Sequence, residues 1–291
     1  MSTTAIDDLT LADLIPVLDV ALRRQEAASR RILDDQEDRS PSTSLYRDAS
    51  ERMDSICSAS PDSGRWACKS GCAACCYQSV PVTAVEALEM ADLVRREFTE
   101  EAQKAVILRL RANAGRNGPS LRSPSSSTPV PCAMLDDRGT CTAHAARPLR
   151  CRGYHSLSAT KCDAALNGQD DVAVPVDPHS CASMRGVQAG LSGAIRNSRR
   201  DGDYYDLHSA VLCALETPDS RRRWENGEDV FAACASTVAV PDDVWIAPQE
   251  DGSVVKLRRA CCGQEEPHLQ LVLIGEDRVI DLGPAVNNRR T

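Results

Sequence analysis

The stretch that decides the fold is Cys68-Lys-Ser-Gly-Cys72-Ala-Ala-Cys75-Cys76, or CKSGCAACC, which places four thiols in nine residues. If the run is helical, a rotation of about 100° per residue puts all four thiols on one face. If it is a turn, Cys72-Ala-Ala-Cys75 forms a two-residue knuckle that grips one ion, and Gly71 lets the backbone approach closely. Thiolates this close repel one another unless a cation is present. The stretch therefore predicts a metal site.

A second group of cysteines follows in PCAMLDDRGTCTAHAARPLRC, residues 131–151. Residues 136–139, Asp-Asp-Arg-Gly, predict a tight turn that brings Cys132 and Cys141 near each other. Pro148 fixes the chain just before Cys151, and Cys162 and Cys181 lie further on. We predict the following metal ligands: Cys68, Cys72, Cys75, Cys76, Cys132, Cys141, Cys151 and Cys162.

The number of sulfurs exceeds one closed site, because a tetrahedral zinc and a four-iron cluster each take four ligands. Either two ions bind, or one site is closed and extra cysteines stand beside it. Thiolates select zinc, iron–sulfur or copper(I) over hard cations. Arg147 and Arg152 flank Cys151 and are candidates to donate hydrogen bonds to sulfur, whereas His144 and His155 are weaker ligand candidates.

The cellular compartment determines whether the 14 cysteines are better interpreted as disulfides or as metal ligands. Asp7, Asp8 and Asp13 stand where a secretory signal needs a basic start and an apolar run, and no apolar run is long enough to span a membrane. We therefore expect a cytoplasmic protein, in which clustered cysteines are metal ligands or redox groups more often than disulfides. Isolated cysteines in helical patterns, such as Cys57, Cys213 and Cys234, are expected to be small buried hydrophobes.

Composition narrows the class of partner. The 291-residue chain carries a net charge of −8, which argues against nucleic acid and against an anionic membrane as partners. With only two Phe, the core has to be built from Ala, Leu, Val and Ile. A metal ion is the expected partner, and a protein partner stays open.

Apolar periodicity predicts a mainly α fold with irregular cysteine-rich loops and a small C-terminal β element. Thr83 with Glu86 forms a capping box that opens a helix, and Thr99 opens the next. The remaining expected helices cover 9–35, 45–58, 181–197 with Ser180 as cap, and 204–216. Residues 116–131 read as a surface loop, and SVVKLRR and LQLVLIGEDRVIDLG read as strands. We expect an N-terminal helical segment over 1–60, a cysteine-cluster domain over 61–200, and a helical plus β-hairpin segment over 201–291.

Taken together, the two groups resemble a bacterial cysteine-cluster family described as a zinc- or iron-chelating domain. The family pattern is a close run ending in Cys75-Cys76, then Val80-Pro-Val-Thr83 with Glu86, then Cys132, Cys141, Arg147-Pro148, Cys151-Arg152 and Gly153-Tyr154. The resemblance covers about residues 65–165. Ala143-His144 departs from it, since the family has an Ile-Tyr or similar pair there. The resemblance implies a metal-binding module, and it favours iron over zinc.

Three functions stay open on the sequence. The first is a metalloprotein with a redox, metal-handling or structural role. The second is a metal-dependent enzyme that modifies a protein or peptide, because flagellin lysine N-methylase is a relative with the same kind of cluster. Cys68-x₃-Cys72-x₂-Cys75 also has the spacing of radical S-adenosylmethionine enzymes, but Ala74 replaces the usual aromatic, and barrel units are missing. The third is an interaction protein stabilised by a zinc knot.

Overall fold

The computed structural model describes residues 11–114, 130–167, 174–232 and 234, together with four strands between residues 245 and 284. The chain divides into two compact units, residues 1–238 and 239–291. Each unit is described below by itself.

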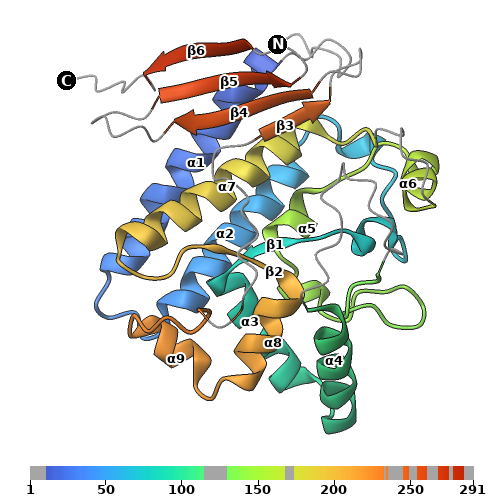
Figure 1. Ribbon diagram of the computed structural model, residues 1–291, viewed down its shortest axis with the longest axis vertical. Coiled ribbons are helices and arrows are strands. Elements are labelled where there is room, and N and C mark those ends of the chain that lie inside the picture. Colours follow the sequence, from blue (N-terminus) through green and yellow to red (C-terminus); the bar gives the residue numbers. More distant parts are fainter. Residues whose placement is uncertain are drawn as a thin grey trace. The chain divides into compact units, whose positions relative to one another are not determined.

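The first unit is built from helices joined by irregular segments, which confirms the predicted mainly α class (Figure 1). Its α-helices are α1 (Leu11–Asp34), α2 (Pro41–Ser58), α3 (Ala84–Glu97), α4 (Glu100–Asn113), α5 (Leu149–Gly153), α6 (Ala159–Leu166), α7 (Pro178–Asn197), α8 (Leu207–Glu216) and α9 (Ser220–Glu225). Short 3₁₀ turns lie at η2 (Ser63–Arg65), η3 (Ala74–Tyr77) and η4 (His144–Ala146).

The longest helix pair of the unit is α1 and α7, which lie side by side (Figure 1). Gly186 and Gly190 of α7 face α1 at close range: a Cβ built on either would lie 2.3 Å from a backbone oxygen, that of Leu18 or of Leu22. Real Cβ atoms do not approach so closely, so glycine at these two positions is what allows the helices to meet.

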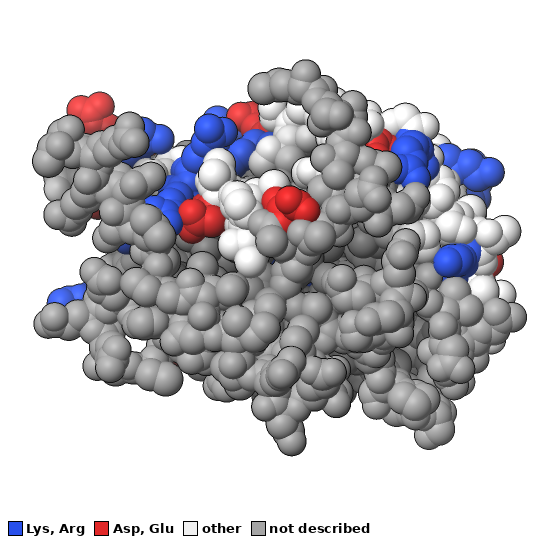
Figure 2. Space-filling model, turned by 90° about the horizontal axis from the view of Figure 1, so that it is seen from above, with Lys and Arg blue, Asp and Glu red and all other residues white. Residues whose placement is uncertain are grey.

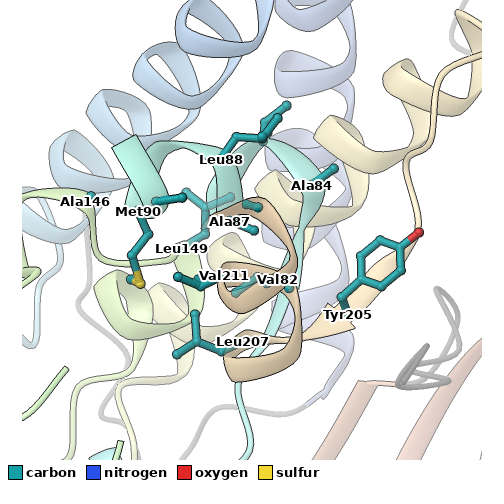
Figure 3. Packing of buried hydrophobic residues seen from close by; sticks show 14 of the residues in the cluster. Val82, Ala84, Ala87, Leu88, Met90, Ala146, Leu149, Tyr205, Leu207 and Val211 are labelled. Carbon is teal, nitrogen blue, oxygen red and sulfur yellow. The ribbon is translucent and has the colours of Figure 1, made fainter. Parts of the chain in front are cut away.

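The core centres on α3, whose side chains are buried from Ala84 to Val94 except for Glu89 and Asp92. Figure 3 shows Ala87 and Met90 of α3 beside Leu149 of α5 and Val211 of α8. Leu149 and Val211 are fully buried. Because α5 also carries Cys151, the apolar core fixes the position of one predicted metal ligand.

Local capping signals identified the starts of two helices, α3 and α4. The capping box of Thr83 and Glu86 is present, and the Thr99 hydroxyl accepts a hydrogen bond from the Ala102 amide, so both predictions are confirmed. Ser180 is not the cap of α7; the Asp177 carboxylate accepts from the Ser180 amide instead. Asp177 is followed by a proline at the first helical position, which Pro favours because its missing N–H has no partner there.

The expected helix over 204–216 begins later. Residues 204–206 form β2 (Tyr204–Asp206), which pairs antiparallel with β1 (Pro81–Thr83), so that Val82 lies opposite Tyr205. Helix α8 starts only at Leu207, with the Asp206 carboxylate accepting from the Ser209 amide. This two-stranded pairing connects the segment after the first cysteine group to the start of α8.

The second unit contains a four-stranded antiparallel sheet in the order β3 (Trp245–Pro248), β4 (Val254–Ala260), β5 (His268–Ile274) and β6 (Arg278–Pro284). Both β-prone runs of the tail are strands, as predicted. Cys261 and Cys262 lie outside the described residues, as does most of the expected loop over 116–131.

Among the described helices, none is long and apolar enough to cross a bilayer. On the described part of the face in Figure 2, basic and acidic side chains alternate at close range. That part of the surface carries no large field of a single sign.

Candidate metal centre

The first cysteine group adopts the turn geometry and not the helical one. The Cys72 amide donates to the Lys69 carbonyl at 3.0 Å, and Gly71 has a φ of 81°, in the left-handed region that glycine adopts without strain. Cys75 and Cys76 follow in η3. The chain therefore reverses between Cys68 and Cys75, so that these residues do not share one helical face.

The second group is shaped by the predicted turn at residues 136–139. The Gly139 amide donates to the Asp136 carbonyl at 3.0 Å, and the Asp136 carboxylate accepts from the backbone amide of Thr140 at 2.8 Å. Leu135 and Cys141 form an antiparallel bridge across this turn. The Cys132 amide donates to the Cys76 carbonyl at 2.8 Å, which joins the second group to the first.

Three cysteines of the second group gather at the start of α5. Cys151 is an electrostatic neighbour of Cys132 and Cys141, and also of Cys75. We call Cys132, Cys141 and Cys151 the inner group. The position of Cys151 is fixed one turn earlier, because the buried Glu86 carboxylate accepts from the Leu149 amide at 2.8 Å.

Three further cysteines are electrostatic neighbours of one another, and two of them are also neighbours of Cys75. Cys162 is an electrostatic neighbour of Cys72, and Cys68 is a neighbour of both. We call Cys68, Cys72 and Cys162 the outer group. Buried Ser156 connects two of them: its amide donates to Cys68 Sγ at 3.3 Å, and the Cys162 thiol donates to its hydroxyl oxygen at 3.0 Å.

Cys75 is an electrostatic neighbour of members of both groups, namely of Cys68 and Cys162 and of Cys141 and Cys151. Its thiol also contacts that of Cys76. The fold thus brings all eight predicted ligands into one region. Cys181 lies at its border, beside Arg150 and Tyr154.

Burial disfavours the thiolate form at most of these positions. It raises the pKa of Cys132 to about 11, and it holds the pKa of Cys151 well above that of a free thiol. The hydrogen bond with Cys76, and then burial, raise the pKa of Cys75. Burial likewise raises the pKa of Cys68, Cys141 and Cys162. Without a cation these sulfurs keep their protons, and a bound metal takes the place of those protons.

The sulfurs lie in one region but do not form a closed coordination shell. In the described part of the chain no three thiols lie within 4.8 Å of one another. A tetrahedral zinc with Zn–S bonds of about 2.3 Å holds its sulfurs about 3.8 Å apart. The donor set is thus chemically suited to zinc or iron, and its spacing is wider than that of a closed mononuclear zinc site.

Among the described residues, one group of three ligand atoms does lie within 4.8 Å of one another, and it belongs to Asp62, Asp177 and His179. The Asp177 carboxylate is already occupied, since one oxygen accepts from the Ser60 hydroxyl at 2.6 Å and from the Trp66 indole at 2.9 Å. It also caps α7. The Asp177 carboxylate of this group therefore fixes the start of α7 and the entry to the first cysteine run.

Arg152 supports the site through the backbone and not through sulfur. Its guanidinium donates to the carbonyls of Ala145 and Arg147 at 2.8 and 3.1 Å, and to the Asp54 carboxylate at 2.7 Å. It thereby holds the loop between Cys141 and Cys151. Of the histidines, His144 contacts Arg147, and His155 stacks on Trp66 with 3.6 Å between the ring centroids.

Ser156 is the supporting residue that the sequence did not reveal. It follows Cys151 by five residues and has no motif around it, and its contacts with Cys68 span 88 residues. Contacts between segments so distant have no local sequence signal.

Comparison with known proteins identifies this region. Residues 67–182 match the model of the CxxCxxCC family, described as "Putative zinc- or iron-chelating domain". All eight cysteines of the inner group, the outer group and the Cys75-Cys76 pair lie inside the matched segment. No curated protein and no solved structure matches the chain. Residues 67–182 of this chain are therefore similar to the CxxCxxCC family, and this similarity supports metal binding.

Proposed function

We propose that the protein binds iron, as an iron–sulfur cluster, through thiols of its inner and outer groups and of the Cys75-Cys76 pair. The observation that supports this most directly is the position of Cys75, which has electrostatic neighbours in both groups. Two segments about 60 residues apart in sequence thus contribute soft donors to one region. The proposal gives the protein a redox, metal-handling or structural role in a reducing cytoplasm.

Iron is favoured over zinc by the spacing of the sulfurs. In a four-iron cluster each cysteine binds a different iron, so the thiolates stand further apart than around a single zinc ion. The described thiols lie in one region, but no three of them are within 4.8 Å of one another, and this spacing suits a cluster. When bound, such a cluster supplies one-electron chemistry. The chain supplies the thiolates, and Arg152 and Ser156 hold the loops that carry them.

The test is anaerobic purification followed by analysis of iron, zinc and acid-labile sulfide. We expect iron and sulfide in comparable amounts and a brown absorbance. Cys72→Ala and Cys151→Ala are each expected to lower the metal content, because each removes a proposed ligand. Cys213→Ser, in α8 and outside both groups, is the control and should leave the metal content unchanged.

Other results separate the alternatives. Colourless protein with stoichiometric zinc would replace iron with a zinc site and a structural role. Protein that holds neither metal, or variants that keep the full metal content, would overturn the ligand assignment.

A further inference from the structure

We infer that the eight cysteines form two separate metal centres, one on the inner group and one on the outer group, each completed by one thiol of the Cys75-Cys76 pair. This inference rests on the proposed metal-binding function and adds to it the number of centres and the division of the ligands. It concerns stoichiometry, and it holds for zinc or iron alike.

The first argument is the number of donors. Zinc in structural sites and iron–sulfur clusters each take four cysteine ligands. The inner and outer groups hold three cysteines each, and the adjacent pair supplies two more. Each group of three, with one thiol of the pair, gives the four ligands of one centre. Two such centres use all eight thiols and leave none of them without a metal.

The second argument is that different parts of the chain position the two groups. The inner group is held by the turn at residues 136–139, by the bridge of Leu135 with Cys141, and by α5, which Glu86 anchors. The outer group is held by Ser156 and by α6, which packs against η3 and carries Cys162. No hydrogen bond within the described residues joins a thiol of one group to a thiol of the other. Each group can therefore close around its own ion.

The third argument is the geometry of the pair between them. Cys75 and Cys76 are consecutive residues of a 3₁₀ turn, and their thiols are in contact. Two adjacent thiols at this point can each complete one centre. Cys75 has neighbours in both groups, and the Cys76 carbonyl accepts from the Cys132 amide at 2.8 Å. The pair thus stands at the boundary between the groups.

The experiment compares the metal content per chain of the full-length protein with that of Cys151→Ser and Cys162→Ser, measured by elemental analysis and native mass spectrometry. We expect each single variant to retain half of the wild-type metal, and the double variant to retain none. Cys213→Ser should retain all of it. If either single variant loses all metal, or if the wild type carries one centre, the inference is wrong while the proposed function survives. A wild type without metal would overturn both.

A second measurement tests the inference even if a cysteine variant fails to fold. Metal release from the wild type to a chelator should occur in two phases of equal amplitude. Ser156→Ala keeps every thiol but removes the hydroxyl that contacts Cys162 Sγ and that can donate to the thiolate once a metal has displaced its proton, so it should accelerate one phase and leave the other unchanged. A single phase in the wild type, or equal acceleration of both phases, would contradict two centres.

Discussion

At the scale of single residues, Asp177 connects three parts of the domain. It caps α7, and it accepts hydrogen bonds from Ser60 after α2 and from Trp66 just before the first cysteine run. Burial by itself raises the pKa of this carboxyl, but the hydrogen bonds from Ser180, Ser60 and Trp66 outweigh burial and hold the pKa below its ordinary value. The ionised form is thus the one that the fold stabilises.

We predict that Asp177→Asn lowers the free energy of unfolding at pH 7 by about 1–3 kcal/mol, the usual effect of disrupting buried hydrogen bonds to a charged group. A depressed carboxyl pKa stabilises the protein above the unfolded-state pKa, and this contribution is lost as the pH falls through the lower folded-state pKa. The difference between variant and wild type should therefore shrink below about pH 4. Urea unfolding at pH 7 and at pH 3 measures it, and a pH-independent difference would contradict the assignment.

Cys213 and Cys234 are a second case at this scale. Both are expected from the sequence to be isolated buried hydrophobes, yet their thiols share a hydrogen bond that lowers the pKa of Cys213 and raises that of Cys234. By contrast, burial raises the pKa of Cys57 to about 11. The two kinds of noncluster cysteine should therefore differ in reactivity, because the thiolate is the nucleophile.

At a mildly alkaline pH of about 7.5, we predict that iodoacetamide alkylates Cys213 of the native protein well before Cys57. Cys234→Ala should slow the reaction at Cys213, because it removes the donor to the thiolate. Peptide mass spectrometry after timed quenching gives both rates. Equal rates at the two cysteines, or no effect of Cys234→Ala, would contradict the proposed hydrogen bond.

At the scale of elements, Glu86 connects the start of α3 with the start of α5. One carboxylate oxygen accepts from the Thr83 amide at 2.7 Å, and the other accepts from the Leu149 amide at 2.8 Å. The first bond belongs to the capping box of α3. The second fixes the turn that ends in Cys151, so one side chain serves both a helix cap and the inner group.

We predict that Glu86→Ala lowers the free energy of unfolding by about 2–3 kcal/mol and also lowers retention of metal, since it leaves buried amides of both helices unsatisfied. Thr83→Ala is the matched control: it weakens the same cap but leaves the bond to Leu149 in place. Chemical unfolding and chelator competition separate the two effects. Equal metal loss in both variants would show that general destabilisation, and not the position of α5, is responsible.

The packing of α1 against α7 gives a prediction with an internal control. A Cβ on Gly186 or Gly190 would meet the backbone of α1, whereas a Cβ on Gly193 of the same helix has no atom within 4 Å. Gly186→Ala and Gly190→Ala should each destabilise the protein by about 1–3 kcal/mol through overpacking. Gly193→Ala should be neutral or stabilising by up to about 1 kcal/mol, because Ala favours the helix. Thermal melts of the three variants rank them, and a similar loss for Gly193→Ala would be contrary evidence.

Local signals account for the elements that the sequence predicted. The caps at Thr83 and Thr99 and the turn at 136–139 depend on residues three or four apart, so their patterns are readable. Strand β2 was not predicted, because Tyr204 and Tyr205 pair with residues more than 100 positions away. The same reason applies to the site: cysteine spacing indicated the candidate ligands, but the contacts of Ser156 and Cys75 depend on how distant segments meet.

At the scale of the whole molecule, the domain match and the cysteine groups all lie in the unit of residues 1–238. The sheet of β3 to β6 satisfies its own hydrogen-bond ladder within residues 239–291. Each unit thus has its own set of stabilising contacts. Among the described residues, the contacts that position the eight thiols come from within the first unit.

We therefore predict that a chain ending at Val238 folds and binds as much metal per molecule as the full-length protein. Circular dichroism should show the helical signal retained, and elemental analysis should give the same metal content. Cys261→Ser with Cys262→Ser in the full-length chain is the companion variant, because it removes the two cysteines of the second unit and leaves the rest of that unit intact. A loss of metal on truncation but not in the companion variant would mean that the second unit supports the fold of the first. A loss in both would make Cys261 and Cys262 ligands, and the division of eight thiols into two sites of four would then be incomplete.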